Sequence, residues 1–195
     1  RIAFSLAAAL LLSACGATAM AAKGKEDTKE TPAAEESTGL NNETILKTVL
    51  DEFGEIAKVP RPSGHTEAIS AYLTGWGKEH GFETVCDEVG NVIMEIPATE
   101  GYEKAAVTIL QVHSDMVCVS DDPDWDGVVT PRIVGNDLYA TDTSLGGDDG
   151  IGIATAMFLV TSPDVVHGPL RLIVTINEEG GSPSGVGNLD PKCVD

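Results

Sequence analysis

The strongest constraint on the fold is a strand, helix and strand pattern in the second half of the chain. Residues 106–112 and 170–176 are short runs of β-forming hydrophobic residues, and residues 151–160 between them form a hydrophobic segment of helical length. Strands connected through a helix usually lie parallel in one sheet, with the helix packed on its face. Two further β-rich runs, residues 84–86 and 91–96, come before them. We therefore predict an α/β fold with a mainly parallel sheet flanked by helices.

Two amphipathic segments precede these strands. Hydrophobic residues recur at spacings of three and four over residues 43–58 and again over residues 66–77, which predicts two helices with one buried face each. The segment Pro-Arg-Pro-Ser-Gly at residues 60–64 ends the first helix. A chain of 195 residues is long enough for one real core and too short for two domains. We place one folded domain at residues 43–195.

The first residues resemble a targeting signal. The chain does not begin with Met, and residues 2–14 form a hydrophobic run shorter than the roughly 20 residues that span a bilayer. The sequence Leu-Ser-Ala-Cys-Gly at residues 12–16 resembles a bacterial lipobox, which implies cleavage before Cys15 and acylation of its thiol. An ordinary secretory peptide, cut near Ala19 or Ala22, is the alternative.

The lipobox interpretation has consequences for location. Residues 1–15 would be a lipoprotein signal peptide with its lipobox, and acyl chains on Cys15 would anchor an extracytoplasmic protein to the bacterial membrane. Residues 16–42 contain no aromatic residue and are rich in Ala, Thr, Glu, Lys, Ser and Gly. Such a composition cannot bury enough apolar surface to offset its ordering entropy, so it predicts a flexible linker.

The charge balance excludes one class of partner and favours another. The chain has 12 Lys and Arg against 31 Asp and Glu, a formal net charge of -19. Nucleic-acid affinity comes mainly from basic residues, so we expect no nucleic-acid partner. Bound divalent cations could neutralise part of the acidic excess. The 4 Cys show no Cys-x-x-Cys spacing, which argues against a zinc finger or a thioredoxin-like motif.

The first candidate site follows the run at residues 106–112, which delivers His113 and then Asp115. Residues two apart on a strand lie on the same side, so Asp115 can accept the second imidazole N–H of His113. That contact would fix the tautomer that presents the other nitrogen to a metal. Taken alone, a His-x-Asp pattern is also typical of a histidine satisfied within a core or loop.

The second candidate site is the glycine-rich segment at residues 143–152, which contains Asp148 and Asp149 and leads into the hydrophobic helix. Either aspartate can cap that helix. Capping explains one carboxylate, and the other remains a candidate metal ligand.

The third candidate site is the pair Glu178 and Glu179, directly after the strand at residues 170–176. Ligands of parallel sheets gather at the carboxyl ends of the strands. Adjacent glutamates repel one another when buried unless a cation or a shared proton compensates, although a solvated loop would also tolerate them. Because His113, Asp148 and this pair would meet at one edge of the sheet, we expect one site there.

Four segments together resemble a known family. Residues 56–64, 110–118, 143–152 and 177–181 are similar, in order, to motifs of the M20 metallopeptidases, most closely of their aminoacyl-histidine (Xaa-His) dipeptidase branch. The resemblance implies that residues 43–195 are a partial zinc-peptidase catalytic domain, equivalent to its amino-terminal half.

The resemblance also implies a role for each site residue. His113 would bind one zinc ion, Asp148 would bridge two, and Glu179 would bind the other. Asp115 would orient His113, and Glu178 would be the general base that takes a proton from a zinc-activated water. Cobalt or manganese would also accept this ligand set.

The same resemblance implies an incomplete site. The family pattern adds an Asp ligand and a late His ligand, and no His of this chain follows Glu178. We therefore expect a truncated dipeptidase that is inactive alone, with Xaa-His or other dipeptides as the whole protein's substrate. The alternative is a surface-anchored lipoprotein that binds peptides or metal without catalysis. A homodimer is compatible with the sequence, which does not determine the oligomeric state.

Overall fold

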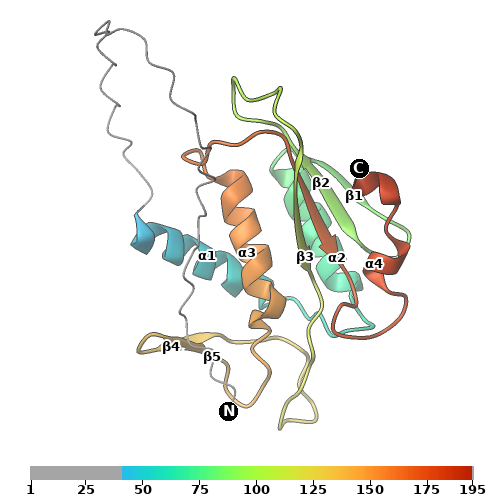
Figure 1. Ribbon diagram of the computed structural model, residues 1–195. Coiled ribbons are helices and arrows are strands. Elements are labelled where there is room, and N and C mark those ends of the chain that lie inside the picture. Colours follow the sequence, from blue (N-terminus) through green and yellow to red (C-terminus); the bar gives the residue numbers. More distant parts are fainter. Residues whose placement is uncertain (1–40, 195) are drawn as a thin grey trace, which may run out of the picture.

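The computed structural model describes residues 41–194 (Figure 1). The signal peptide, Cys15 and residues 16–40 of the linker lie outside the described residues. Helix α1, Asn42–Ile56, begins one residue before the domain boundary expected from the sequence. The side chain of Asn41 caps it, because its Oδ1 accepts the backbone N–H of Thr44 at 2.8 Å.

The two amphipathic segments form the predicted helices. Helix α1 buries Val49, Phe53 and Ile56. Helix α2, Glu67–Glu79, ends two residues later than expected and buries a similar stripe on its inner face, made of Ile69, Ser70, Leu73, Trp76 and Gly77. The hydrophobic members of both stripes belong to the main hydrophobic core.

A four-stranded sheet forms the centre of the domain, in the order β1-β2-β6-β3. The strands are β1 (Glu83–Cys86), β2 (Val92–Ile96), β3 (Thr108–His113) and β6 (Leu170–Thr175). Strand β6 pairs parallel with β3 and antiparallel with β2, which itself pairs antiparallel with β1. The α/β fold with a helix-flanked sheet is therefore confirmed.

The expectation of a mainly parallel sheet is wrong, since the sheet is mixed. Strands β1 and β2 are joined by the short turn at residues 87–91, and a parallel crossover needs a dozen or more residues. Asp87 builds this turn, because its Oδ1 accepts the backbone N–H groups of Val89, Gly90 and Asn91 at 2.9–3.0 Å. The two strands therefore form a hairpin that adds antiparallel pairing to the sheet.

Helix α3, Gly147–Thr161, connects the parallel strands β3 and β6. It lies beside α1 on one side of the sheet, whereas the short helix α4, Gly185–Asn188, lies near the opposite side (Figure 1). A two-stranded ribbon that the sequence pattern did not predict joins β4 (Arg132–Val134) to β5 (Asp137–Tyr139). The last element is a 3-10 helix, Pro191–Cys193.

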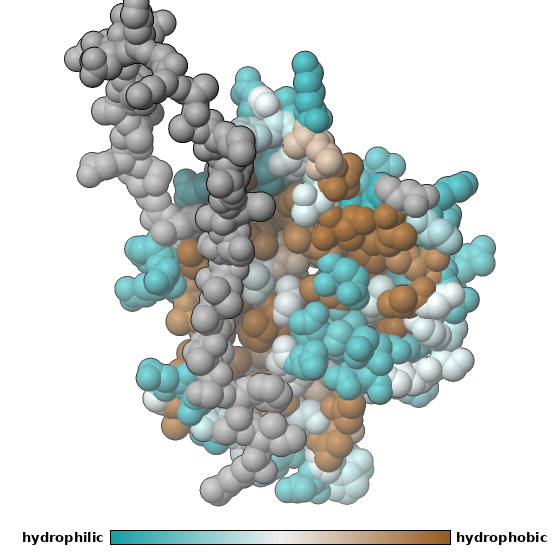
Figure 2. Space-filling model, in the orientation of Figure 1, coloured by the Kyte–Doolittle hydropathy of each residue, from teal (hydrophilic) through white to brown (hydrophobic). Residues whose placement is uncertain are grey.

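The two faces of the sheet differ in their covering. The face that packs into the main hydrophobic core carries Met94 and Leu172, both fully buried. On the other face, Ile93 and Arg171 are partly exposed. Seen from the direction of Figure 1, hydrophobic and hydrophilic residues form separate patches on the surface (Figure 2). Among residues 41–194, no helix has the length and hydrophobicity needed to cross a bilayer.

Candidate metal centre

The topology brings the three predicted clusters to one edge of the sheet. Strands β3 and β6 are parallel neighbours, and His113 pairs with Thr175 at the end of their ladder. The segment that follows β6 therefore begins beside His113. Asp148 lies in the first turn of α3, the helix that connects these strands.

The imidazole of His113 is buried and held by both of its nitrogens. Its Nδ1 lies 3.1 Å from the backbone carbonyl of Asp115 and 3.5 Å from the Oδ1 atom of the same residue. The predicted partner is therefore present, with its main chain in closer contact than its carboxylate. The Nε2 atom lies 3.0 Å from Asp148 Oδ1, so this nitrogen faces the acidic groups.

Asp115 connects the histidine to the glutamate pair. Its side chain is fully buried and accepts a hydrogen bond from Ser63 Oγ at 2.6 Å. It also accepts the backbone N–H groups of Glu178 at 2.9 Å and Glu179 at 3.2 Å. Burial opposes ionisation, but the hydrogen bonds from His113, Ser63 and the two N–H groups outweigh it and lower the pKa of Asp115 to about 2. One buried carboxylate thus positions both the imidazole and the backbone of the glutamates.

The two aspartates at the start of α3 have separate roles. The N-cap of this helix is Gly146, without a side-chain cap, and Asp148 and Asp149 have non-helical backbone angles. Asp149 accepts hydrogen bonds from the backbone N–H groups of Gly152 and His113. It therefore caps the regular part of the helix, as one aspartate was expected to do. Asp148 is exposed and faces His113, which leaves its carboxylate available to a metal.

The glutamate pair is exposed on a constrained loop. Asn177, which precedes the pair, has a positive φ of 55° and is buried. Its Oδ1 accepts the backbone N–H of Gly64 at 2.7 Å. From this loop, Glu178 Oε2 approaches within 3.7 Å of His113 Nε2. Both carboxylates of the pair thus extend from a backbone that side-chain hydrogen bonds hold in place.

The arrangement of donor atoms fits a divalent metal ion. Among residues 41–194, one group of three potential ligands comes together, with ligand atoms of His113, Asp148 and Glu179 all within 4.8 Å of one another. The ligand atoms of a tetrahedral zinc ion are about 3.3 Å apart, so small side-chain rotations would complete the contacts. An imidazole nitrogen with carboxylate oxygens suits zinc, cobalt or manganese.

The charge of His113 depends on the same neighbours. Burial lowers the basicity of the ring, but its hydrogen bonds to Asp115 and Asp148 outweigh this effect and raise the pKa of His113 to about 9. The pKa of Asp149 is raised by burial. In the metal-free protein a protonated ring therefore offsets the surrounding carboxylates, and a metal would have to displace that proton.

Three supporting residues were missed by the sequence interpretation, which placed residues 60–64 and 177 in family-like motifs but gave their side chains no role in the site. Ser63 contacts Asp115, and Asn177 holds the glutamate loop. Arg61 is buried and donates to the carbonyls of Ser114 and Gly146. No local pattern in the sequence signals these contacts, because each joins segments more than 50 positions apart.

Known proteins are similar to this chain over part of its length. The cytosol non-specific dipeptidase of Escherichia coli is 40% identical over 146 residues, which covers 70% of this chain and 29% of that protein. Peptidase T of Exiguobacterium is 36% identical over 88 residues, covering 42% of this chain and 20% of that protein. The crystal structure of aminoacylhistidine dipeptidase from Vibrio alginolyticus matches with a TM-score of 0.69 and 37% identity. That match covers 73% of this chain and 30% of the solved structure.

The chain thus spans less than a third of the length of the curated relatives that it matches. No family model matches the sequence.

Proposed function

Because this chain is similar over part of its length to two dipeptidases, we propose that it belongs to the M20 peptidases and carries part of the active site of a metal-dependent dipeptidase. The observation that carries the proposal is the convergence of His113, Asp148 and Glu179 on one point, with Glu178 beside them. These residues come from three separate segments, the end of β3, the start of α3 and the loop after β6. Their meeting is therefore a product of the fold.

We assign the metal to the three converging residues and the proton transfer to the fourth. His113, Asp148 and Glu179 would hold zinc. Zinc bound there would lower the pKa of a water molecule and polarise the peptide carbonyl. Cobalt or manganese could replace it in vitro.

Glu178 has the position and exposure that a general base requires. Its carboxylate is solvent-accessible and lies beside the imidazole of His113, at the rim of the ligand group. From this position it can take a proton from the attacking water and return it to the leaving amine. Asp115 keeps Glu178 in place by accepting its backbone N–H, so the base does not have to bind metal to be positioned.

The substrate class follows from the relatives. A cytosol non-specific dipeptidase and an aminoacylhistidine dipeptidase are both similar to this chain. We therefore propose dipeptides as substrates of the protein to which the chain contributes, either Xaa-His or a broader range.

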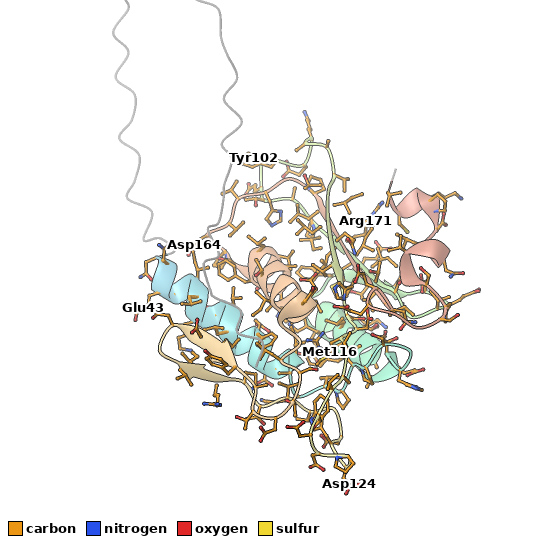
Figure 3. The ribbon with its side chains drawn as sticks, turned by 60° about the horizontal axis from the view of Figure 1, so that its bottom comes forward. Glu43, Tyr102, Met116, Asp124, Asp164 and Arg171 are labelled. Atoms are coloured by element: carbon orange, nitrogen blue, oxygen red, sulfur yellow. The ribbon has the colours of Figure 1, made fainter. Side chains whose placement is uncertain are left out.

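The test compares two variants of the protein encoded by the entire reading frame. Glu178→Gln keeps the size of the side chain but cannot accept the proton, so we expect dipeptide hydrolysis to fall by at least 100-fold while the bound zinc is retained. Glu43→Gln is the matched control, because Glu43 lies on α1 away from the site (Figure 3). Hydrolysis that survives Glu178→Gln would contradict the assignment of the base.

We expect the 195-residue chain to bind metal without turning over substrate. The family pattern has five ligands, of which this chain would supply His113, Asp148 and Glu179. Dipeptidase activity of the purified chain that is lost on chelation would contradict this expectation.

We also propose that the amino-terminal segment anchors the protein to the outer side of a bacterial membrane through lipid on Cys15. The support is the lipobox-like sequence at residues 12–16 and the polar segment that follows it. Replacing Cys15 by Ala should move the expressed protein from the detergent phase to the aqueous phase in a Triton X-114 partition. An unchanged partition would exclude the anchor.

A further inference from the structure

We propose that Arg61 is a positioning residue for this site, which sets the separation between His113 and Asp148. The inference rests on the proposed metal centre and identifies a residue outside the ligand set that shapes it. The argument starts from the burial of Arg61, whose side chain is only 1% exposed. A buried guanidinium is costly unless its N–H groups find acceptors.

The acceptors lie on the two backbone segments that carry the ligands. Arg61 Nη1 donates to the carbonyl of Ser114 at 3.0 Å and to that of Asp115 at 3.4 Å. Its Nη2 donates to the carbonyl of Gly146. Ser114 directly follows His113, and Gly146 is two residues before Asp148. One planar group thus bridges the exit of β3 and the entry to α3.

The other end of the Arg61 residue is fixed as well. Its own carbonyl accepts the backbone N–H of Met116 at 2.9 Å, and Pro62 forms an isolated parallel bridge with Met116. Ser63 N–H donates to the Met116 carbonyl at 3.2 Å. Hydrogen bonds hold both the main chain of Arg61 and its guanidinium. The side chain therefore keeps the segments that it contacts at a fixed separation.

Two glycines leave the room that the guanidinium occupies. A Cβ atom added at Gly146 would lie 2.5 Å from Arg61 Nη2 and 2.5 Å from Met116 Sδ. A Cβ atom added at Gly150 would lie 2.6 Å from the same Arg61 nitrogen. The absence of a side chain at Gly146 and Gly150 therefore leaves space for the guanidinium of Arg61.

The charge of Arg61 fits this location. Burial lowers its pKa to about 10, so it remains protonated at neutral pH, and Asp115, Asp148 and Asp149 lie close enough to favour the charged form. The guanidinium thus places a positive charge close to the carboxylates of Asp115, Asp148 and Asp149, which would otherwise repel one another. A lysine would keep the charge but has a single ammonium group, which cannot hold two separate carbonyl positions in one plane.

The experiment titrates zinc into the purified full chain by calorimetry. The variants are Arg61→Lys, which keeps the charge, and Gly146→Ala, whose Cβ displaces the end of Arg61 and also strains a backbone with a φ of 65°. Arg171→Lys is the matched control, because Arg171 donates to the carbonyls of Lys192 and Cys193 in the same manner. It lies beside the 3-10 helix Pro191–Cys193 and well apart from Met116, whose backbone N–H donates to the Arg61 carbonyl (Figure 3).

We expect Arg61→Lys and Gly146→Ala to weaken zinc binding by about 10- to 100-fold, as loss of a group that orients metal ligands does. Arg171→Lys should stay within about twofold of the wild type, even if it unfolds at a lower urea concentration, since a purely structural loss does not change the affinity of the folded protein. Circular dichroism at each titration condition establishes the folded fraction.

The outcomes separate the two proposals. Wild-type binding with unchanged affinity in the Arg61 and Gly146 variants, or an equal loss in Arg171→Lys, would overturn the role of Arg61 and leave the metal centre intact. No zinc binding by the wild type would overturn both. If Arg61→Lys does not fold, Gly150→Ala decides the question by the same loss of zinc affinity, because Gly150 has a helical backbone and its Cβ would meet the same Arg61 nitrogen at 2.6 Å.

Discussion

The two halves of the candidate site differ in how they are held. The side chains of His113 and Asp115 are 9% and 0% exposed, and hydrogen bonds hold both. In the other half, the side chains of Asp148 and Glu178 are 70% and 54% exposed. Their carboxylates lie beside the Nε2 atom of His113. The fold thus sets the buried half before any metal arrives, whereas the exposed half depends on a cation for its final geometry.

We therefore expect mutations in the buried half and in the exposed half to differ in their effect on the free energy of unfolding. Exposed carboxylates contribute little to folding because water already solvates them, and their mutual repulsion is relieved by a metal. A buried, hydrogen-bonded carboxylate contributes to folding because its donors would be left unpaired without it. The predictions below use this contrast, from the largest expected effect to the smallest.

Asp115→Ala should destabilise the metal-free chain by about 3–5 kcal/mol, since it leaves the Ser63 hydroxyl and two backbone N–H groups without their acceptor. Urea unfolding monitored by circular dichroism measures the change. A decrease of less than about 1 kcal/mol in the free energy of unfolding would contradict a stabilising role of the buried half.

Asp148→Ala should have the opposite profile. We expect its free energy of unfolding without metal to stay within about 0.5 kcal/mol of the wild type, because the side chain is exposed. Its zinc affinity should fall by at least 100-fold, since a ligand is lost. Calorimetric titration checks the affinity, and equal zinc binding in this variant would remove Asp148 from the ligand set.

The affinity for zinc should depend on pH through His113. The metal needs the neutral ring, whereas the pKa of His113 is raised to about 9 in the metal-free protein. Between pH 6 and 8 the affinity should therefore rise about tenfold per pH unit, with about one proton released per zinc bound. Titrations in buffers of different ionisation enthalpy count the protons, and a count near zero would contradict the raised pKa.

The metal-free chain should be most stable in mildly acidic solution. The pKa of Asp115 is lowered to about 2, so its stabilising contribution is present above about pH 4 and is lost as the pH falls toward 2. The pKa of His113 is raised to about 9, so its contribution is full below about pH 6.5 and is lost as the pH rises through 9. Unfolding midpoints between pH 3 and 10 should show this window, and a midpoint that keeps rising above pH 7 would contradict it.

Much of the arrangement could be predicted from periodicity and connection length. The strand, helix and strand pattern implied that the ends of β3 and β6 share an edge, which placed His113 beside the glutamate loop. The mixed sheet could also have been anticipated, because the turn at residues 87–91 is too short for a parallel crossover.

The finer division of roles could not be predicted in the same way. Which of Asp148 and Asp149 caps the helix depends on where its regular turns begin, and a backbone kink decides that. The contacts of Arg61 and Ser63 join segments more than 50 positions apart, for which local patterns carry no signal.

The most direct test of the account is a crystal structure of the untagged chain grown with zinc, with anomalous data collected at the zinc edge. The account predicts an anomalous peak bonded to His113 Nε2, Asp148 and Glu179, with Glu178 nearby and not coordinated. A peak at other residues, or one coordinated by Glu178 while Glu179 points away, would contradict it.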